Sequence, residues 1–98
     1  MGRADRSVRL ASHIDLLGYR QRNREWWVFE LKRGRPSDAV VGQTSRYLTW
    51  VAQEHRRDRT HGAIIARQSD RKLLYAVKAN PRLSLWEFDS DLHVRQVS

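Results

Sequence analysis

The chain has 98 residues, of which 40% are hydrophobic, and it contains no cysteine. This length predicts one compact domain over residues 1–98, and the missing cysteines exclude disulfide scaffolds, thiolate zinc sites and cysteine nucleophiles. Nineteen Lys and Arg against eleven Asp and Glu give a net charge of +8, which favours a polyanionic partner, with nucleic acid as the first candidate. No apolar run approaches the roughly 20 residues of a membrane span, so we expect no membrane partner and a cytoplasmic location.

The first part of the chain is rich in apolar segments that favour β-strands. Residues 8–19 indicate one or two strands with a break near Ser12 and His13, and a polar turn follows over 18–25. The run WWVFEL over 26–31 is almost continuously apolar, which is typical of a central strand buried on both faces. Together these segments predict a β-hairpin.

The second part of the chain alternates helical and strand patterns. The expected elements are a helix from Ser37 or Asp38 to about His55, a strand over 61–67, a helix over 70–79, and strands over 83–88 and 92–97. The resulting order βββαβαβ(β) predicts an α/β fold with a mixed β-sheet flanked by helices.

Charged residues inside two apolar segments indicate a functional site. Glu30 and Lys32 lie two positions apart in a strand and therefore share a face, while Asp15 stands between Ile14 and Leu16. Burying an unpaired carboxylate costs several kcal/mol, so two carboxylates in adjacent strands suggest a shared cation. Oxygen ligands favour Mg²⁺ or Mn²⁺, and Lys32 beside the metal could orient or help deprotonate an attacking water. The pattern predicts a phosphodiesterase site.

Simpler interpretations exist for the same residues. The triplet Glu30-Leu31-Lys32 could be an edge-strand ion pair, because such triplets arise by chance in a chain with 31% charged residues. Arg33, Arg35 and Arg46 could clamp DNA phosphates or lie in solvated surface. The four tryptophans are expected to be core or dimer contacts rather than base-stacking platforms. The histidines show no metal-ligand spacing, so no zinc site is expected.

Two motifs resemble a known nuclease superfamily. Asp15 followed by Glu30, Leu31 and Lys32 resembles the D…ExK signature of the PD-(D/E)XK nucleases, and Gln43 with Tyr47 resembles the QxxxY helix motif of their RecB-like branch. Over residues 9–88, the strings HIDLLG, VFELKRGR, DAVVGQTSRYLTWV and LSLWEFD look most like the C-terminal nuclease domain of the EndoMS/NucS mismatch-specific DNA endonucleases.

The resemblance implies a restriction-endonuclease-like core and Mg²⁺-dependent cleavage of double-stranded DNA in DNA repair. By the same resemblance Asp15, Glu30 and the Leu31 carbonyl would bind the metal, Lys32 would assist the water, and Gln43 and Tyr47 would support the site. It also leads us to expect that the family's first helix and N-terminal DNA-binding domain are absent here, so that a homodimer or a partner chain supplies specificity. The alternative is a catalytically inactive DNA-binding or oligomerisation module with the nuclease fold.

Overall fold

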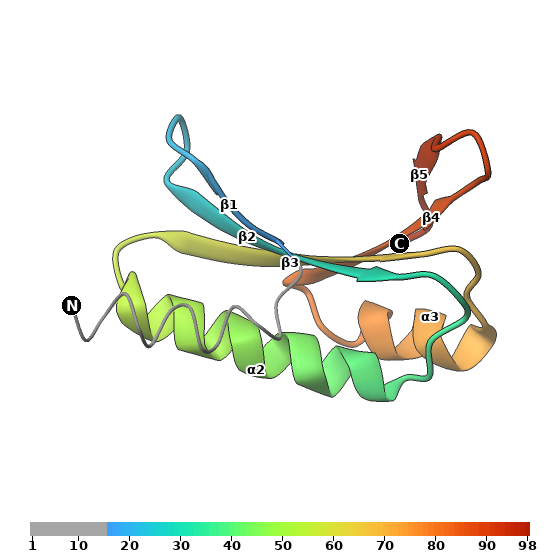
Figure 1. Cartoon of the computed structure of the whole chain (residues 1–98). Helices are drawn as coiled ribbons and strands as arrows, with labels where there is room; N and C mark the ends of the chain where they lie inside the picture. The colour runs from blue at the N-terminus through green and yellow to red at the C-terminus, as the bar shows by residue number, and fades with distance from the viewer. Residues whose placement is uncertain (1–15) are drawn as a thin grey trace.

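A five-stranded mixed sheet, with strand order β1-β2-β3-β4-β5, is the centre of the computed structural model, which describes residues 16–98 (Figure 1). The three middle strands run parallel, and the first and last strands pair antiparallel with their neighbours. The strands are β1 (Leu16–Arg20), β2 (Glu25–Lys32), β3 (Arg59–Ala66), β4 (Leu83–Phe88) and β5 (Val94–Gln96).

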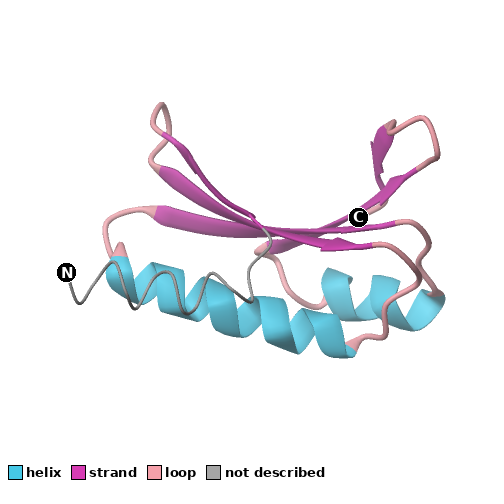
Figure 2. Cartoon of the chain, viewed as in Figure 1, coloured by secondary structure: helices cyan, strands magenta, loops and turns pink. Residues whose placement is uncertain are grey.

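Two helices connect the parallel strands within the described part of the chain, α2 (Ala39–Glu54) between β2 and β3 and α3 (Arg71–Lys78) between β3 and β4. Both lie on the same face of the sheet (Figure 2). Successive crossovers of one hand place their helices on one face when the strand order does not reverse. An α/β fold with a mixed sheet is thus confirmed, whereas the described helices cover one face only.

Polar side chains start the helices close to the predicted positions. The Asp70 carboxylate accepts a hydrogen bond from the Leu73 backbone N–H at 2.8 Å, which caps α3. At α2 the Ser37 hydroxyl accepts a bond from the Ala39 N–H at 3.3 Å, while the Asp38 side chain makes no capping bond. Both helices therefore begin and end within two residues of their predicted bounds.

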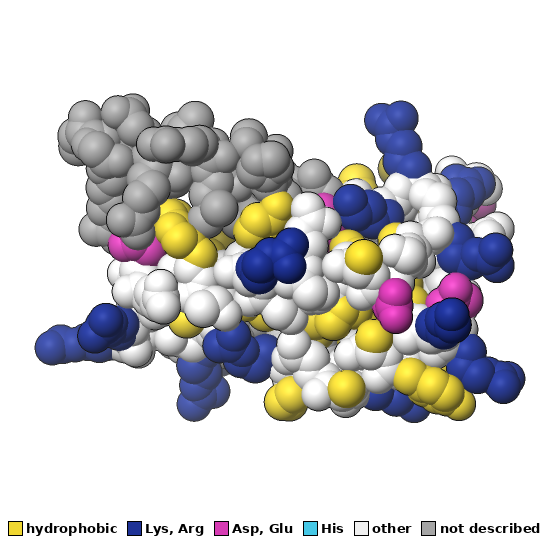
Figure 3. Space-filling view, turned by 90° about the horizontal axis from the view of Figure 1, so that it is seen from below, with side chains coloured by type: hydrophobic (Ala, Val, Ile, Leu, Met, Phe, Trp, Pro, Cys, Tyr) yellow, Lys and Arg dark blue, Asp and Glu magenta, His cyan; other side chains and the backbone are white. Residues whose placement is uncertain are grey.

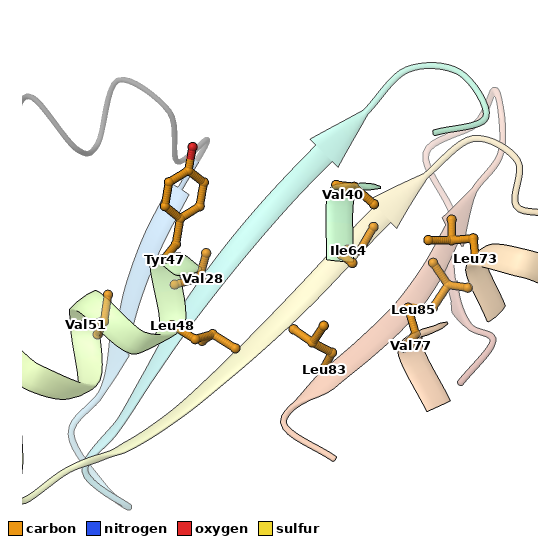
Figure 4. Close-up of a cluster of buried hydrophobic side chains, with 10 residues drawn as sticks. All are labelled: Val28, Val40, Tyr47, Leu48, Val51, Ile64, Leu73, Val77, Leu83 and Leu85. Atoms are coloured by element: carbon orange, nitrogen blue, oxygen red, sulfur yellow. The ribbon is translucent and has the colours of Figure 1, made fainter. Parts of the chain in front are cut away.

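The core lies between the sheet and the two helices (Figure 4). Leu48 of α2, Ile64 of β3 and Leu73 of α3 are fully buried there. Gly62 allows α2 to approach β3 closely, because a Cβ at this position would lie 3.2 Å from the Thr44 Cγ2 and 3.3 Å from the Leu48 Cδ1. The same Cβ would lie 2.6 Å from the Leu83 Cδ2 on β4. Burial of these aliphatic side chains supplies the main driving force for folding.

Strand β2 is buried on one face only, so the prediction that it is buried on both faces is wrong. Val28 and Glu30 face the helices and are 0% and 2% exposed. Trp27 and Phe29 on the opposite face are half-buried, and Leu31 is 52% exposed. The run is continuously apolar because both faces carry large side chains, although no described element covers the second face.

The β1–β2 hairpin is present, with a tighter turn than predicted. β1 ends at Arg20 and β2 begins at Glu25, and Arg24 has a positive φ of 56° in the turn. One or two strands are expected over 8–19, and residues 8–15 of this segment lie outside the described residues. Among residues 16–98, neither helix combines the length and the apolar character needed to cross a membrane.

Candidate active site at the end of strand β2

Glu30 lies near the carboxyl end of β2, on the face that the helices cover. Its register partner is Ile64 of the parallel neighbour β3, and it is 2% exposed. Parallel strands present their carboxyl ends at one edge of a sheet, the usual place for ligand sites in α/β folds. The carboxylate is therefore held on a rigid, buried strand rather than in a loop.

Lys32 lies on the same face as Glu30, as the two-residue spacing predicts. Its Nζ is 3.3 Å from the Glu30 Oε2, and the lysine side chain is 37% exposed while that of Glu30 is 3% exposed. The ammonium group thus lies between the buried carboxylate and the solvent. The ion pair of the simpler interpretation is therefore present, on a strand that lies between β1 and β3 rather than at the edge of the sheet.

A cavity of about 280 Å³ opens beside this pair, between the end of β2 and the start of α2. Its polar lining includes Lys32, Ser37 and Gln43. Pro36, Ala39 and Val40 complete the wall. The lysine therefore faces a space large enough to receive a phosphate group.

Gln43 and Tyr47 form a hydrogen-bonded pair on α2. The Gln43 Nε2 donates to the Tyr47 Oη at 3.1 Å, as residues four apart on a helix can do. Tyr47 is 8% exposed and belongs to the core cluster, and its hydroxyl points away from Val28 in Figure 4. One end of this pair lines the cavity and the other end is anchored in the core.

Arg33 and Arg35 lie in the exposed loop that follows β2, and Arg46 is exposed on α2. Basic side chains are spread over the helix-covered face, where acidic side chains are few (Figure 3). The structure thus places all three predicted DNA-binding arginines on elements that adjoin the Lys32 cavity.

Some of the oxygen atoms near the end of β2 are suitable ligands for a hard divalent cation. Glu30 offers a carboxylate and Leu31 a backbone carbonyl, which are ligands that Mg²⁺ and Mn²⁺ accept. Asp15, the second predicted carboxylate, lies outside the described residues. Glu30 and Leu31 are therefore the two predicted ligands that the described part of the chain contains.

A second group of possible metal ligands lies in the β4–β5 turn, and the sequence analysis missed it. Ligand atoms of Asp89, Asp91 and His93 lie within 4.8 Å of one another. The Asp89 Oδ1 accepts bonds from the Asp91 and His93 backbone N–H groups at 2.9 and 3.0 Å. The His93 bond lowers the pKa of the Asp89 carboxyl despite some desolvation. The D-x-D-x-H spacing in the sequence was the signal that could have revealed this group. The hydrogen bonds that form the turn are sufficient to explain why these residues lie together.

Trp50 lies on α2, and the other tryptophans divide between the two faces of the sheet. Trp26 stacks on His55 at 4.0 Å between ring centroids, and its indole N–H donates to the Asp58 carboxylate at 3.0 Å. Its packing agrees with the predicted core role. Trp27 and Trp86 lie on the opposite face and line a cavity of about 340 Å³ with Phe29.

Comparison with family models, with curated proteins and with solved structures gave no match for this chain. The nuclease resemblance therefore rests on the motif residues of the sequence alone.

Proposed function

We propose that this chain is a metal-dependent endonuclease that hydrolyses phosphodiester bonds of DNA, with a role in DNA repair. The observation that supports this most is the buried Glu30 carboxylate, which lies 3.3 Å from the ammonium of Lys32, a residue that lines the cavity. A charged pair on the core side of a strand is costly to build, and such pairs concentrate at functional sites.

The residues around the cavity have different proposed roles in phosphodiester hydrolysis. Lys32 orients the attacking water beside the phosphate through its Nζ, which is 3.3 Å from the Glu30 carboxylate. Gln43, held by Tyr47, presents its amide to the same cavity and fixes the substrate or the water. Arg33, Arg35 and Arg46 neutralise phosphates on either side of the scissile bond.

Glu30 and the Leu31 carbonyl, with Asp15, would hold Mg²⁺ or Mn²⁺. When bound, such a cation lowers the pKa of a coordinated water and offsets the negative charge that grows on the phosphate. Glu30 on its rigid strand would fix the cation relative to Lys32.

Cleavage of plasmid DNA and of mismatched duplexes tests the proposal. We expect cutting by the wild type with Mg²⁺ or Mn²⁺, no cutting with EDTA, and a loss of at least about 100-fold in Glu30→Gln and Lys32→Ala. Glu87→Gln is the matched control, since Glu87 is also a paired carboxylate on a parallel strand, 2.7 Å from Arg95. Equal activity of Glu30→Gln and Glu87→Gln would refute the assigned site.

Metal binding gives a readout that does not depend on turnover. Mg²⁺ or Mn²⁺ should raise the melting temperature of the wild type by a few degrees, because a ligand that binds only the folded state stabilises it. The rise should disappear in Glu30→Gln and in Asp15→Asn. DNA binding without metal-dependent cleavage or melting shift would instead identify an inactive binding module.

A further inference from the structure

Helix α3 presents one side to solvent, and the charged side chains on that side are all basic. We call it the α3 stripe and define it by the four exposed side chains of the helix, Arg71, Lys72, Tyr75 and Lys78. Positions 71, 75 and 78 lie together because they are four and three residues apart on a helix. Leu73 and Val77, on the opposite side, are 0% and 1% exposed. The stripe is therefore carried by a helix that the core holds in place.

The three cations of the stripe are not neutralised by carboxylates of the described part of the chain. No carboxylate there forms an ion pair with Arg71, Lys72 or Lys78, whereas Arg95 is paired at 2.7 Å. The Asp70 carboxylate at the start of α3 accepts a backbone hydrogen bond of the helix instead. The positive charge of the stripe is therefore available to an anion from outside the chain.

Two of these cations lie where a helix disfavours positive charge. Arg71 and Lys72 are the first residues of α3, and its first turn contains no acidic side chain. The free N–H groups of a first turn carry a partial positive charge, so cations there destabilise a helix and carboxylates stabilise it. Positions that break such a local rule are expected at functional sites. The placement of Arg71 and Lys72 thus favours a role in binding over a role in stability.

Tyr75 adds an aromatic ring between these cations. It is 61% exposed, and among the described residues its ring has no stacking neighbour and its hydroxyl has no hydrogen bond. Trp26 and Trp27, by contrast, stack on histidine rings at 4.0 and 4.9 Å between centroids. Single-stranded nucleic acid binds where bases stack on free aromatic rings and phosphates meet basic groups. The α3 stripe offers both kinds of contact on one side of a helix.

The α3 stripe lies on the same side of the sheet as the proposed active site. Because α2 follows β2 and α3 follows β3, both helices begin near the edge where these parallel strands end, and α3 lies beside the first half of α2 (Figure 1). The Asn80 Nδ2, just after α3, donates a hydrogen bond to the Ser45 Oγ of α2 at 2.9 Å. Ser45 precedes Arg46, one of the arginines assigned to DNA phosphates. The basic surface of α2 therefore continues onto α3.

We propose that the α3 stripe binds a single-stranded segment of nucleic acid, with an unpaired base on the Tyr75 ring and the neighbouring phosphates on the three cations. Paired bases are stacked on one another inside a duplex, so the ring can receive only an unpaired base. If the proposed nuclease function holds, the stripe selects substrates with an unpaired segment near the scissile bond. Binding itself does not rest on that function, because it requires neither Glu30 nor a metal ion.

Fluorescence anisotropy of the full chain tests the proposal, with oligo(dT) of about 15 nucleotides and a blunt duplex as probes, in EDTA and about 150 mM salt. Tyr75→Leu should bind oligo(dT) at least about fivefold more weakly and the duplex within about twofold of the wild type. Tyr75→Phe should keep the wild-type affinity, because stacking needs the ring and not the hydroxyl. Arg71→Glu with Lys72→Glu should weaken oligo(dT) binding at least about tenfold without lowering the melting temperature, because carboxylates suit the first turn.

Arg56→Glu with Arg57→Glu is the matched control, since it makes the same change in charge on exposed residues beyond the other end of α2. Circular dichroism verifies that each variant is folded. Equal losses in the two double variants would overturn the proposal, as would an equal effect of Tyr75→Leu on oligo(dT) and on the duplex. Binding of the wild type to vesicles of anionic phospholipid but not to oligo(dT) would assign the stripe to a lipid surface instead. Binding of oligo(dT) through Tyr75 by a chain that cuts no DNA would refute the nuclease and support this proposal.

Discussion

At the residue scale, replacing Glu30 and Lys32 one at a time measures how each partner affects the free energy of unfolding. Lys32→Ala leaves the buried carboxylate with less compensation and is expected to lower the free energy of unfolding by about 1–2 kcal/mol, because the lysine is partly solvated. Glu30→Gln removes the buried charge and keeps the shape, so it should be neutral or stabilising. Urea unfolding followed by tryptophan fluorescence measures both. A Glu30→Gln variant less stable than Lys32→Ala would show that the carboxylate mainly stabilises the fold.

Asp58, at the opposite end of the sheet, makes a pH-dependent contribution to the free energy of unfolding. Hydrogen bonds from the Trp26 indole and from Arg24 lower the pKa of its carboxyl from the ordinary 3.8, against a smaller effect of desolvation. The ionised form therefore adds stability above about pH 3.8, and this stability is lost as the pH falls through the folded-state pKa. Asp58→Asn should be less stable than the wild type at pH 7, and the difference should shrink as the pH is lowered below 3.8. A difference that stays constant as the pH falls would assign the loss to packing around Trp26.

At the scale of elements, the contact between α2 and β3 depends on Gly62. In Gly62→Ala the added methyl would lie 2.6 Å from the Leu83 Cδ2 and 3.2 Å from the Thr44 Cγ2, so the helix or the Leu83 side chain must shift. We expect a loss of about 1–3 kcal/mol in thermal or urea unfolding. Gly34→Ala is the matched control, since a Cβ there meets nothing within 4 Å. Equal stability of the two variants would show that α2 adjusts freely on the sheet.

The sequence predicted these elements well where local signals and apolar periodicity agree. The Asp70 cap and the amphipathic run that follows place α3 within one residue at each end. Lys32 and Glu30 share a face because of the strand period alone, which no tertiary contact needs to decide. Gln43 and Tyr47 meet for the same kind of reason, the spacing of four residues on a helix.

Features that depend on the third dimension could not be predicted in the same way. The run WWVFEL gives no sign that Leu31 is half exposed, because apolar residues on both faces of a strand look alike whether or not a layer covers them. The group of Asp89, Asp91 and His93 depends on a turn in which Leu92 takes a positive φ of 63°. The cavity beside Lys32 depends on where the chain after β2 brings the start of α2.

At the scale of the whole molecule, the two faces of the sheet differ in chemistry. The helix-covered face holds Glu30 and Lys32 and carries many basic side chains (Figure 3), whereas the middle of the opposite face has no charge. The basic charge on the helix-covered face favours a polyanion, so a DNA duplex at the proposed site would lie on that side of the sheet.

This division predicts which arginines a DNA duplex contacts. In a cleavage-deficient Glu30→Gln background, the triple variant Arg33→Ala, Arg35→Ala, Arg46→Ala should bind duplex DNA more weakly and with a flatter salt dependence. Each lost phosphate contact reduces the slope of log K against log salt by about 0.9, so a reduction of roughly 2–3 is expected from fluorescence anisotropy titrations.

Three arginines near the other end of α2 make a control of equal charge. Arg56, Arg57 and Arg59 are all exposed, and they follow the last turn of the helix rather than the end of β2. Their triple replacement by alanine removes the same net charge but leaves the surface around Lys32 intact, so the slope should change by less than about 1. Similar slopes for the two triple variants would mean that DNA responds to total charge only. The arginines beside the cavity would then have no special part in positioning the substrate.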